Sequence, residues 1–395
     1  LTITDAGGLA TIAALGATTP GALVITDSTS GVTFSSTVSA TTLLVSDTTL
    51  AKTITFSGNL TVSTGMTVTG TANAYNVAIA GGTNSIAGTT TFSNTGTLTI
   101  GNDSTDSTTF TAGLTATAPS ALNIAGAIIA TTGTSTISLG DANTAVAVTA
   151  TAVIGGAATG LIDLGNATLA DAATLTVGTG TSNAINLDAV TGTAGSSASN
   201  LTINTTGAAA VAGVVGTDIG TVTVTNSGGT AFSGTVSAAT VAITSSTAGT
   251  TVSFADSLTV TTAMTVGAGS AAYNVSVTGA SNSVAGTTTF SNTGTLTIGA
   301  AAGTSQFTGG LVATANSSRT LYGTISTVGA AMNLGTVTLG AATILDTGNA
   351  AAGTMTVGNV TSGGFGLTLD SGSTALATIG MGTMADMSGG LTITD

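Results

Sequence analysis

The densest group of residues that could do chemistry is the acidic turn at residues 101–108, Gly-Asn-Asp-Ser-Thr-Asp-Ser-Thr, where Asp103 and Asp106 stand three apart. Carboxylate oxygens are the ligands that Ca²⁺ prefers, so Asp103 and Asp106 are candidate calcium ligands. The corresponding stretch in the second half of the chain, residues 299–306, has no acidic residue, which favours a solvated turn. Calcium is the one cofactor for which the sequence contains candidate ligands, and we expect no other.

The commonest catalytic mechanisms are excluded by the residue types that the chain lacks. It has no histidine and no cysteine, so neither a nucleophile paired with histidine nor the usual zinc site can be built. The tripeptide Asp346-Thr347-Gly348 matches the catalytic loop of aspartic proteases, which need two carboxylates that share a proton. No second Asp-Thr-Gly is present. We therefore predict that Asp346 closes a turn and that the protein is not an enzyme.

The charge balance limits the possible partners. Lys52 and Arg319 are the two basic residues, the net charge is -13, and charged residues make up 4% of the chain. Nucleic acid is excluded as a partner because phosphate binding needs many Lys and Arg contacts. A free monomer normally carries about 25–35% charged surface residues, so this composition favours self-association with further copies. No run of about eighteen apolar residues is free of Thr, Ser or Gly, so no transmembrane segment is predicted in this window.

The chain consists of two copies of one long unit. Residues 74–101 and 272–299 have nearly the same sequence, shifted by 198 positions. The ends repeat as well, because residues 1–5 and 391–395 both read Leu-Thr-Ile-Thr-Asp. Such internal repetition is typical of stacked repeat architectures. We predict a window from a longer array, with a first copy at 1–200, a second copy at 201–390 and the start of a third at 391–395.

A gap between the copies indicates the length of the smallest structural unit. Phe110 corresponds to Phe307 at a shift of 197, whereas residues 174–178 correspond to 354–358 at a shift of 180. The second copy therefore lacks a segment between these points, although the flanking sequence is kept. The loss of one whole coil from a stack would leave this pattern, which predicts coils of about 17–22 residues.

Within a coil the pattern is typical of strands. Segments such as Thr-Ile-Thr-Phe and Thr-Leu-Thr-Ile alternate apolar residues with Thr at period two, and Gly, Asn and Asp separate them. Thr, Val and Ile are poor helix formers. We predict an all-β fold, a right-handed parallel β-solenoid with coils of the length given above. Tandem immunoglobulin-like β-sandwiches of about 100 residues each remain the alternative.

Eight of the nine phenylalanines recur at equivalent positions of the two copies, as core residues of a repeat should. In a solenoid we expect them to form a structural ladder in the core. The predicted ladder comprises Phe34, Phe56, Phe92, Phe110, Phe232, Phe254, Phe290 and Phe307.

Stretches such as Thr-Thr-Thr-Phe-Ser-Asn-Thr-Gly-Thr-Leu-Thr-Ile-Gly at residues 89–101 resemble giant bacterial β-strand-repeat surface proteins and the passenger regions of autotransporters. The resemblance covers the whole chain and lies in composition and rhythm. It implies an extracellular, cell-surface protein of the S-layer, sheath or adhesin type, and it brings no functional residues with it. We predict a structural repeat protein that assembles with further copies into a coat, sheath or fibre. The alternative is an adhesin stalk or binding module that presents a Thr/Ser-rich face to a cell or a glycan.

Overall fold

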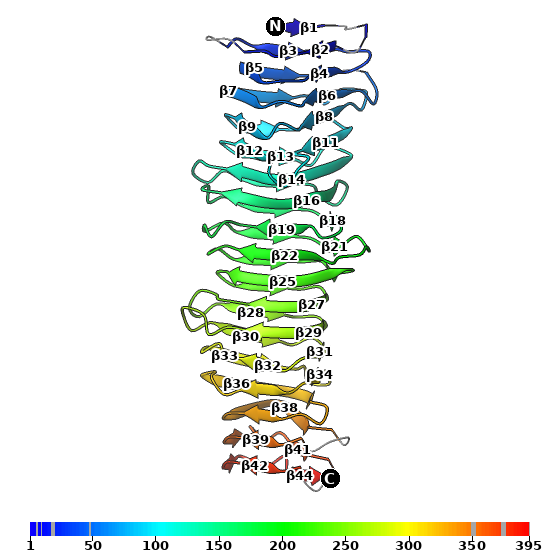
Figure 1. Cartoon of the computed structure of the whole chain (residues 1–395). Coiled ribbons are helices and arrows are strands. Elements are labelled where there is room, and N and C mark those ends of the chain that lie inside the picture. The colour runs from blue at the N-terminus through cyan, green and yellow to red at the C-terminus, as the bar shows by residue number, and fades with distance from the viewer. Residues whose placement is uncertain are drawn as a thin grey trace. The chain divides into compact units, whose positions relative to one another are not determined.

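The computed structural model describes residues 1–4, 7–8, 10–16, 20–46, 49–348, 353–372 and 377–394. The chain divides into two compact units, Leu1–Gly207 and Ala208–Asp395. Each unit is a β-solenoid, in which short strands stack in parallel on the strands of the next turn (Figure 1). No helix occurs in the described part of the chain. The parallel pairing confirms the predicted all-β solenoid and excludes immunoglobulin-like sandwiches, whose strands pair antiparallel.

The first unit arranges its strands in three columns, and the chain enters each column once per turn. Four long strands bend around a corner and belong to two columns. Column one contains β1 (Thr2–Ile3), β3 (Leu23–Ile25), the second halves of β5 (Val38–Val45) and β7 (Leu60–Val68), β10 (Thr90–Thr91), β13 (Leu114–Ala116), β15 (Ile137–Leu139), β17 (Ile162–Leu164) and β20 (Ile185–Leu187). Column two contains β2 (Ala10–Ile12), β4 (Val32–Phe34), β6 (Thr53–Phe56), β8 (Asn76–Ile79), β11 (Thr97–Ile100), the first halves of β14 (Ala121–Ala130) and β16 (Ala145–Gly156), β18 (Ala167–Leu169) and β21 (Val190–Gly192). Column three contains the first halves of β5 and β7, β9 (Thr83–Ile86), β12 (Ser107–Phe110), the second halves of β14 and β16, β19 (Thr174–Val177) and β22 (Ser199–Asn204).

The second unit is built in the same way, also from three columns. Its first column contains β23 (Ala209–Val211), β26 (Thr230–Phe232), β28 (Thr251–Phe254), β30 (Asn274–Val277), β33 (Thr295–Ile298), the first halves of β36 (Ser318–Ser326) and β38 (Val337–Asp346), β40 (Val360–Thr361) and β43 (Met384–Ala385). Its second column contains β24 (Val215–Gly216), the first halves of β27 (Val236–Ile243) and β29 (Leu258–Val266), β31 (Ser281–Val284), β34 (Thr304–Phe307), the second halves of β36 and β38, β41 (Leu367–Asp370) and β44 (Leu391–Thr394). Its third column contains β25 (Ile219–Asn226), the second halves of β27 and β29, β32 (Thr288–Phe290), β35 (Leu311–Ala313), β37 (Met332–Leu334), β39 (Met355–Val357) and β42 (Ile379–Met381).

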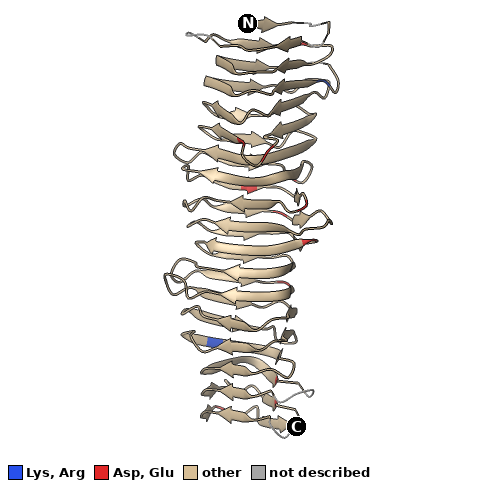
Figure 2. Cartoon of the chain, in the orientation of Figure 1, with Lys and Arg blue, Asp and Glu red and all other residues tan. Residues whose placement is uncertain are grey.

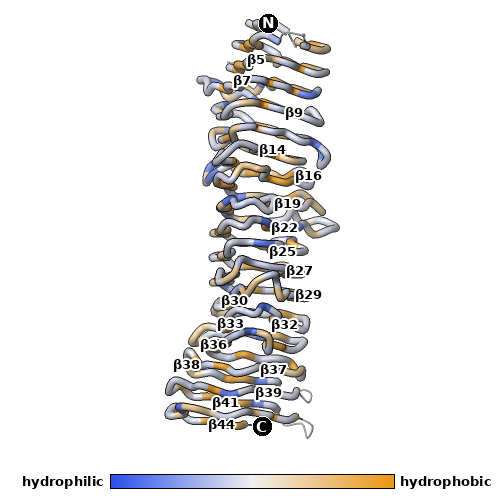
Figure 3. Tube along the Cα trace, turned by 90° about the vertical axis from the view of Figure 1, so that its left-hand side faces the viewer, coloured by the Kyte–Doolittle hydropathy of each residue, from blue (hydrophilic) through white to orange (hydrophobic). Residues whose placement is uncertain are grey.

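Alternation along each strand creates the core. In β11 the side chains of Leu98 and Ile100 are fully buried, whereas those of Thr97 and Thr99 are only half-buried. Leu98 pairs with Val77 of the preceding turn and with Leu122 of the next turn, so inward residues stack on inward residues. Figure 3 follows this change between apolar and polar residues along the chain trace. Each buried Leu, Ile or Val side chain contributes about 1.5–3 kcal/mol to folding, so a narrow core built from many such rows suffices.

The turns vary in length more than the sequence predicts. Paired residues of the first unit are separated by 20 positions between Leu23 and Leu43 and by 26 between Leu175 and Leu201. In the second unit the step falls to 18 between Thr320 and Thr338 and reaches 24 elsewhere. The coil length predicted from the sequence therefore holds for some turns and is too short for others. The extra residues lie at the corners, where the backbone need not follow the register of the columns.

Asparagine side chains replace backbone hydrogen bonds at some corners. The amide oxygen of Asn84 accepts from the backbone N–H of Leu60 in the preceding turn at 2.9 Å, and its amide nitrogen donates to Thr108 Oγ1 of the next turn at 3.0 Å. Asn282, the equivalent residue of the second copy, makes the same two bonds at 3.2 and 3.0 Å, to Leu258 and Ser305. One buried side chain thus links three turns in each unit.

A glycine is required at one corner of each unit. Gly126 has a φ of 70°, and a Cβ atom there would lie 2.2 Å from the carbonyl oxygen of Asp106. Gly323, its equivalent, has a φ of 61°, and its Cβ atom would lie 2.4 Å from the carbonyl oxygen of Ala300. Both the left-handed backbone and the close approach therefore need glycine.

The two copies provide a matched test of core packing. Thr230 and its first-copy equivalent Val32 are both buried, and Thr230 Oγ1 has no hydrogen-bond partner among the described residues. Because an unpaired buried hydroxyl costs about 1–3 kcal/mol, Thr230→Val should raise the free energy of unfolding by about that amount. The reverse change, Val32→Thr, should lower it similarly. Urea denaturation of both variants measures these changes, and a loss of stability in Thr230→Val would contradict the packing described here.

Candidate functional site

The acidic turn that the sequence marks for calcium lies between β11 and β12. Asp106 is buried, and its Oδ2 accepts from the backbone N–H groups of Asn102 and Asp103 at 2.8 and 3.1 Å. Asp103 Oδ1 accepts from the backbone N–H and the hydroxyl of Thr105, both at 2.9 Å. Each carboxylate therefore closes its own part of the turn, which is a structural use of both residues.

Electrostatics agree with this use of the carboxylates. The hydrogen bond from the backbone N–H of Thr105 lowers the pKa of Asp103 below its ordinary value, because it stabilises the charged form. Within the residues that the structure describes, His, Cys, Asp and Glu nowhere gather in a group of three or more that could hold a metal ion. Calcium binding by Asp103 and Asp106 stays a prediction.

A second pair of carboxylates consists of Asp346, which the sequence marks as a turn residue, and Asp370, which it does not mark. Asp346, the last residue of β38, pairs in register with Asp370, the last residue of β41. Asp346 Oδ1 accepts from the backbone N–H of Gly348 at 2.6 Å, and Asp370 Oδ1 accepts from that of Gly372 at 3.0 Å. Asp346 therefore closes a turn, as predicted, and Asp370 does the same one turn later. The sequence conceals this pair because the two residues are 24 positions apart.

The eight predicted ladder phenylalanines are all buried, and their rings meet in four pairs. Phe34 and Phe56 are register partners whose rings stack with centroids 5.0 Å apart. Their equivalents Phe232 and Phe254 stack at 4.9 Å. Stacking along a column therefore recurs in both units.

The remaining pairs have another geometry. Phe92 and Phe110 meet edge to face with centroids 5.9 Å apart, and Phe290 and Phe307 meet in the same way at 6.0 Å. Phe92 follows β10 in column one, whereas Phe110 ends β12 in column three. These rings meet across the interior, so the phenylalanines form separate pairs and not one continuous row.

In the sequence Arg319 is noted only as one of the two basic residues, but its side chain occupies a buried position of β36. It is 5% exposed, and its guanidinium donates to the carbonyl oxygens of Ala313, Asn316 and Thr336. Burial lowers the pKa of Arg319 because it penalises the charged form. The equivalent residue of the first copy is Leu122, which is also buried. The alignment of Arg319 with the apolar residue Leu122 is the feature of the sequence that indicates a buried arginine.

Replacing this arginine tests whether the charge stabilises the fold. Arg319→Leu should keep the free energy of unfolding within about 1 kcal/mol of the parent or raise it, since apolar replacement of a buried charge is often neutral or stabilising. Arg319→Ala should lower it by about 2–5 kcal/mol because it leaves a cavity. Denaturant unfolding compares the two variants. Equal losses in both would mean that the three carbonyl contacts are essential.

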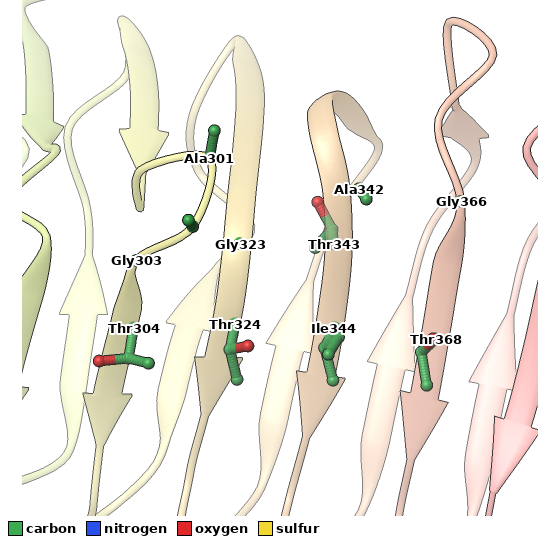
Figure 4. Close-up of a pocket in the computed structure, with 11 residues that line it drawn as sticks. Ala301, Gly303, Thr304, Gly323, Thr324, Ala342, Thr343, Ile344, Gly366 and Thr368 are labelled. Carbon is green, nitrogen blue, oxygen red and sulfur yellow. The ribbon is translucent and has the colours of Figure 1, made fainter.

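One concavity of about 310 Å³ lies in the second unit, over neighbouring turns of its second column (Figure 4). Small residues at the bends of the strands leave it open, and Thr304, Thr324 and Ile344 lie side by side across it in register. The side chain of Ile344 is 41% exposed. In the first copy the acidic turn stands at the corresponding corner, because Gly126 corresponds to Gly323.

Two further grooves occupy equivalent positions in the two units. The first, about 380 Å³, lies beside Met66 and is lined by Met66, Thr67, Val68, Thr69, Gly70, Thr89, Thr91 and Ser93. The second, about 270 Å³, lies beside Met264 and is lined by Met264, Thr265, Val266, Gly267, Thr287, Thr289 and Ser291. We call them the Met66 groove and the Met264 groove. All residues that line them are uncharged, and every polar side chain among them is that of a Thr or a Ser.

No protein-family model, no curated protein and no solved structure matches the chain. No helix in the described ranges has the length and apolar character needed to cross a membrane.

Buried tyrosines hold one wall of each groove. The hydroxyl of Tyr75 donates to the carbonyl oxygen of Thr69 at 2.6 Å, and that of Tyr273 donates to the carbonyl oxygen of Gly267 at 2.6 Å. Both side chains are fully buried. The chain at the groove edge is therefore tied to the core in each unit.

The ionisation of Tyr273 should make stability fall at alkaline pH. Burial raises the pKa of Tyr273 to about 12, above its ordinary value of 10.0. The unfolded chain therefore releases this proton first, so the contribution of Tyr273 is complete below about pH 10 and is lost as pH rises towards about 12. Denaturant unfolding at several pH values measures the slope. Tyr273→Phe should reduce it, and an unchanged slope in that variant would contradict the assignment.

Proposed function

We propose that the protein is a structural, extracellular repeat protein that associates with further copies of itself into a coat, sheath or fibre at the cell surface. The observation that carries this proposal is the scarcity of charged residues, which make up 4% of the chain and are few along each unit (Figure 2). Charged side chains normally keep soluble proteins apart. Faces without them can meet through methyl and hydroxyl groups.

One outward row illustrates the character of these faces. In the first column of the second unit, Thr297, Thr320, Thr338 and Thr361 follow one another in register. Their side chains are half-buried or exposed. Such a row presents alternating methyl and hydroxyl groups on a regular strand surface, which suits contact with an equivalent surface.

The internal construction supports a mechanical role. Each turn is joined to the next by parallel backbone hydrogen bonds and by stacked inward side chains, as at Leu98 and Leu122. Most contacts of a turn are therefore made with its two neighbours, which is the arrangement that makes repeat proteins extended and stiff along their stack.

Sedimentation velocity and electron microscopy of the purified chain test self-association. We expect assemblies that grow with protein concentration and persist in high salt, because few charges contribute to the contact. The variant Thr320→Asp/Thr361→Asp should weaken assembly, since it adds negative charge to a chain of net charge -13.

The variant Thr320→Ser/Thr361→Ser is the matched control and should assemble like the parent. Single copies at every concentration would contradict the proposal. On intact cells that make the protein, antibody labelling should find it outside, as an ordered layer or filaments. Isolated rods projecting from the cell would instead support an adhesin.

A further inference from the structure

The Met66 and Met264 grooves each present three hydroxyl groups that make no hydrogen bond within the part of the chain that the structure describes. These hydroxyls belong to Thr67, Thr91 and Ser93 in the first unit and to Thr265, Thr289 and Ser291 in the second. The two threonines of each set are exposed and the serine is half-buried. Each groove therefore has unused hydrogen-bonding capacity that faces outward.

The other groove hydroxyls have partners inside the protein. Thr69 Oγ1 donates to the carbonyl oxygen of Val45 at 3.3 Å, and Thr89 Oγ1 donates to that of Ala112 at 3.2 Å. In the second unit, Thr287 Oγ1 donates to the carbonyl oxygen of Gly309 at 2.7 Å. The free hydroxyls are thus a distinct subset of the lining.

The two copies retain this subset, as they also retain the exposed pair Thr61 and Ser85 at Thr259 and Ser283. All three free hydroxyls have the same residue type in both units, whereas Thr69 is replaced by Gly267. Outside the grooves, the outward residue Thr33 is replaced by Ala231 and Thr109 by Gln306. The free hydroxyls therefore belong to the outward positions that both copies keep, and their place in a concave surface sets them apart from the others.

The spacing and chemistry of the free hydroxyls define a class of ligand. Thr265 and Thr289 lie side by side in register, and Ser291 follows two residues later. Neighbouring strands are about 4.8 Å apart and alternate residues of a strand about 6.6 Å, so the hydroxyls form a regular array. Each hydroxyl both donates and accepts, and the threonine methyl groups contact apolar C–H groups.

An extended neutral sugar chain meets all of these requirements. It offers hydroxyl groups at regular intervals, apolar C–H faces between them, and no charge. An acidic polysaccharide is disfavoured, because the chain has a net charge of -13. We propose that the protein carries two equivalent binding sites for a neutral oligosaccharide, one in the Met66 groove and one in the Met264 groove. These sites are independent of the self-association proposed above.

The methionines at the grooves make the proposal directly measurable. The chain has seven methionines, so ¹³C-methyl labelling gives a simple NMR spectrum in which Met66 and Met264 report on the two grooves. We would titrate the chain with cellohexaose, maltohexaose and mannohexaose, each to about 10 mM, a range suited to weak binding. At least one sugar should shift the signals of Met66 and Met264. The side chains of Met66 and Met264 are themselves buried at inward positions of the groove strands, so they report on the grooves from the core side. The signals of Met332 and Met355, which are equally buried but lie outside both grooves, should stay in place.

Paired variants assign the binding to the grooves. Thr67→Val/Thr91→Val should weaken binding in the first unit by about tenfold, as expected for two lost hydrogen bonds, and leave the response of Met264 intact. Thr265→Val/Thr289→Val should have the opposite effect. Thr33→Val, which removes an outward hydroxyl away from the grooves, is the matched control and should bind like the parent.

Three results would overturn the proposal: no shift with any of the three sugars, equal shifts of all methionines, or unchanged binding in both double variants. Sedimentation of the same samples separates this result from self-association. Failure to bind sugar with assembly intact would refute the sites alone, and sugar binding by single copies would refute assembly alone.

Discussion

Parallel backbone pairing between consecutive turns is the constraint on which the rest of the structure depends. Once two turns are in register, every inward side chain must lie on an inward side chain of the next turn. Size therefore has to match only between neighbouring turns, as it does for Val77, Leu98 and Leu122. This is why a chain with only 3% aromatic residues can fill a core in each unit. Each ladder phenylalanine meets its partner ring within the same turn or the next, as Phe34 meets Phe56.

The corners are where this pairing stops, and they follow different chemistry. Backbone groups that have lost their strand partner are satisfied by side chains, as Asn84 and Asn282 do for Leu60 and Leu258. Close approach of one turn to the next selects glycine at Gly126. Asn84, Asn282 and Gly126 therefore have specific structural roles, although Asn and Gly are common throughout the sequence. The candidate calcium turn lies at such a corner, between β11 and β12, whereas the grooves lie over the ends of paired strands such as β29 and β32.

The architecture could be predicted from the sequence because the alternation of apolar and polar residues and the internal repetition can be recognised without knowing which residues pair. The turn length could be predicted only in part, since the corners take up additional residues, as in the step of 26 positions between Leu175 and Leu201. Without the turn length, the pairing of Asp346 with Asp370 stays hidden, and so do the grooves, whose walls come from two turns. Asp103 and Asp106 were found from their spacing, but spacing does not tell which backbone groups the carboxylates bind. The buried position of Arg319 was accessible only by reading it against Leu122.

The variable length of the corners has a practical use. Between β11 and β12 the first copy has one residue more than the second copy has between β33 and β34, and the strands on either side still pair with the turns next to them. Height within a unit is therefore counted in turns, about 4.8 Å each, and not in residues. A peptide grafted into this corner would be held at a known level on the scaffold, and two grafts in one unit would be separated by a whole number of such steps. Each unit thus provides attachment points at fixed heights along its stack, and these heights do not depend on the peptide that is inserted.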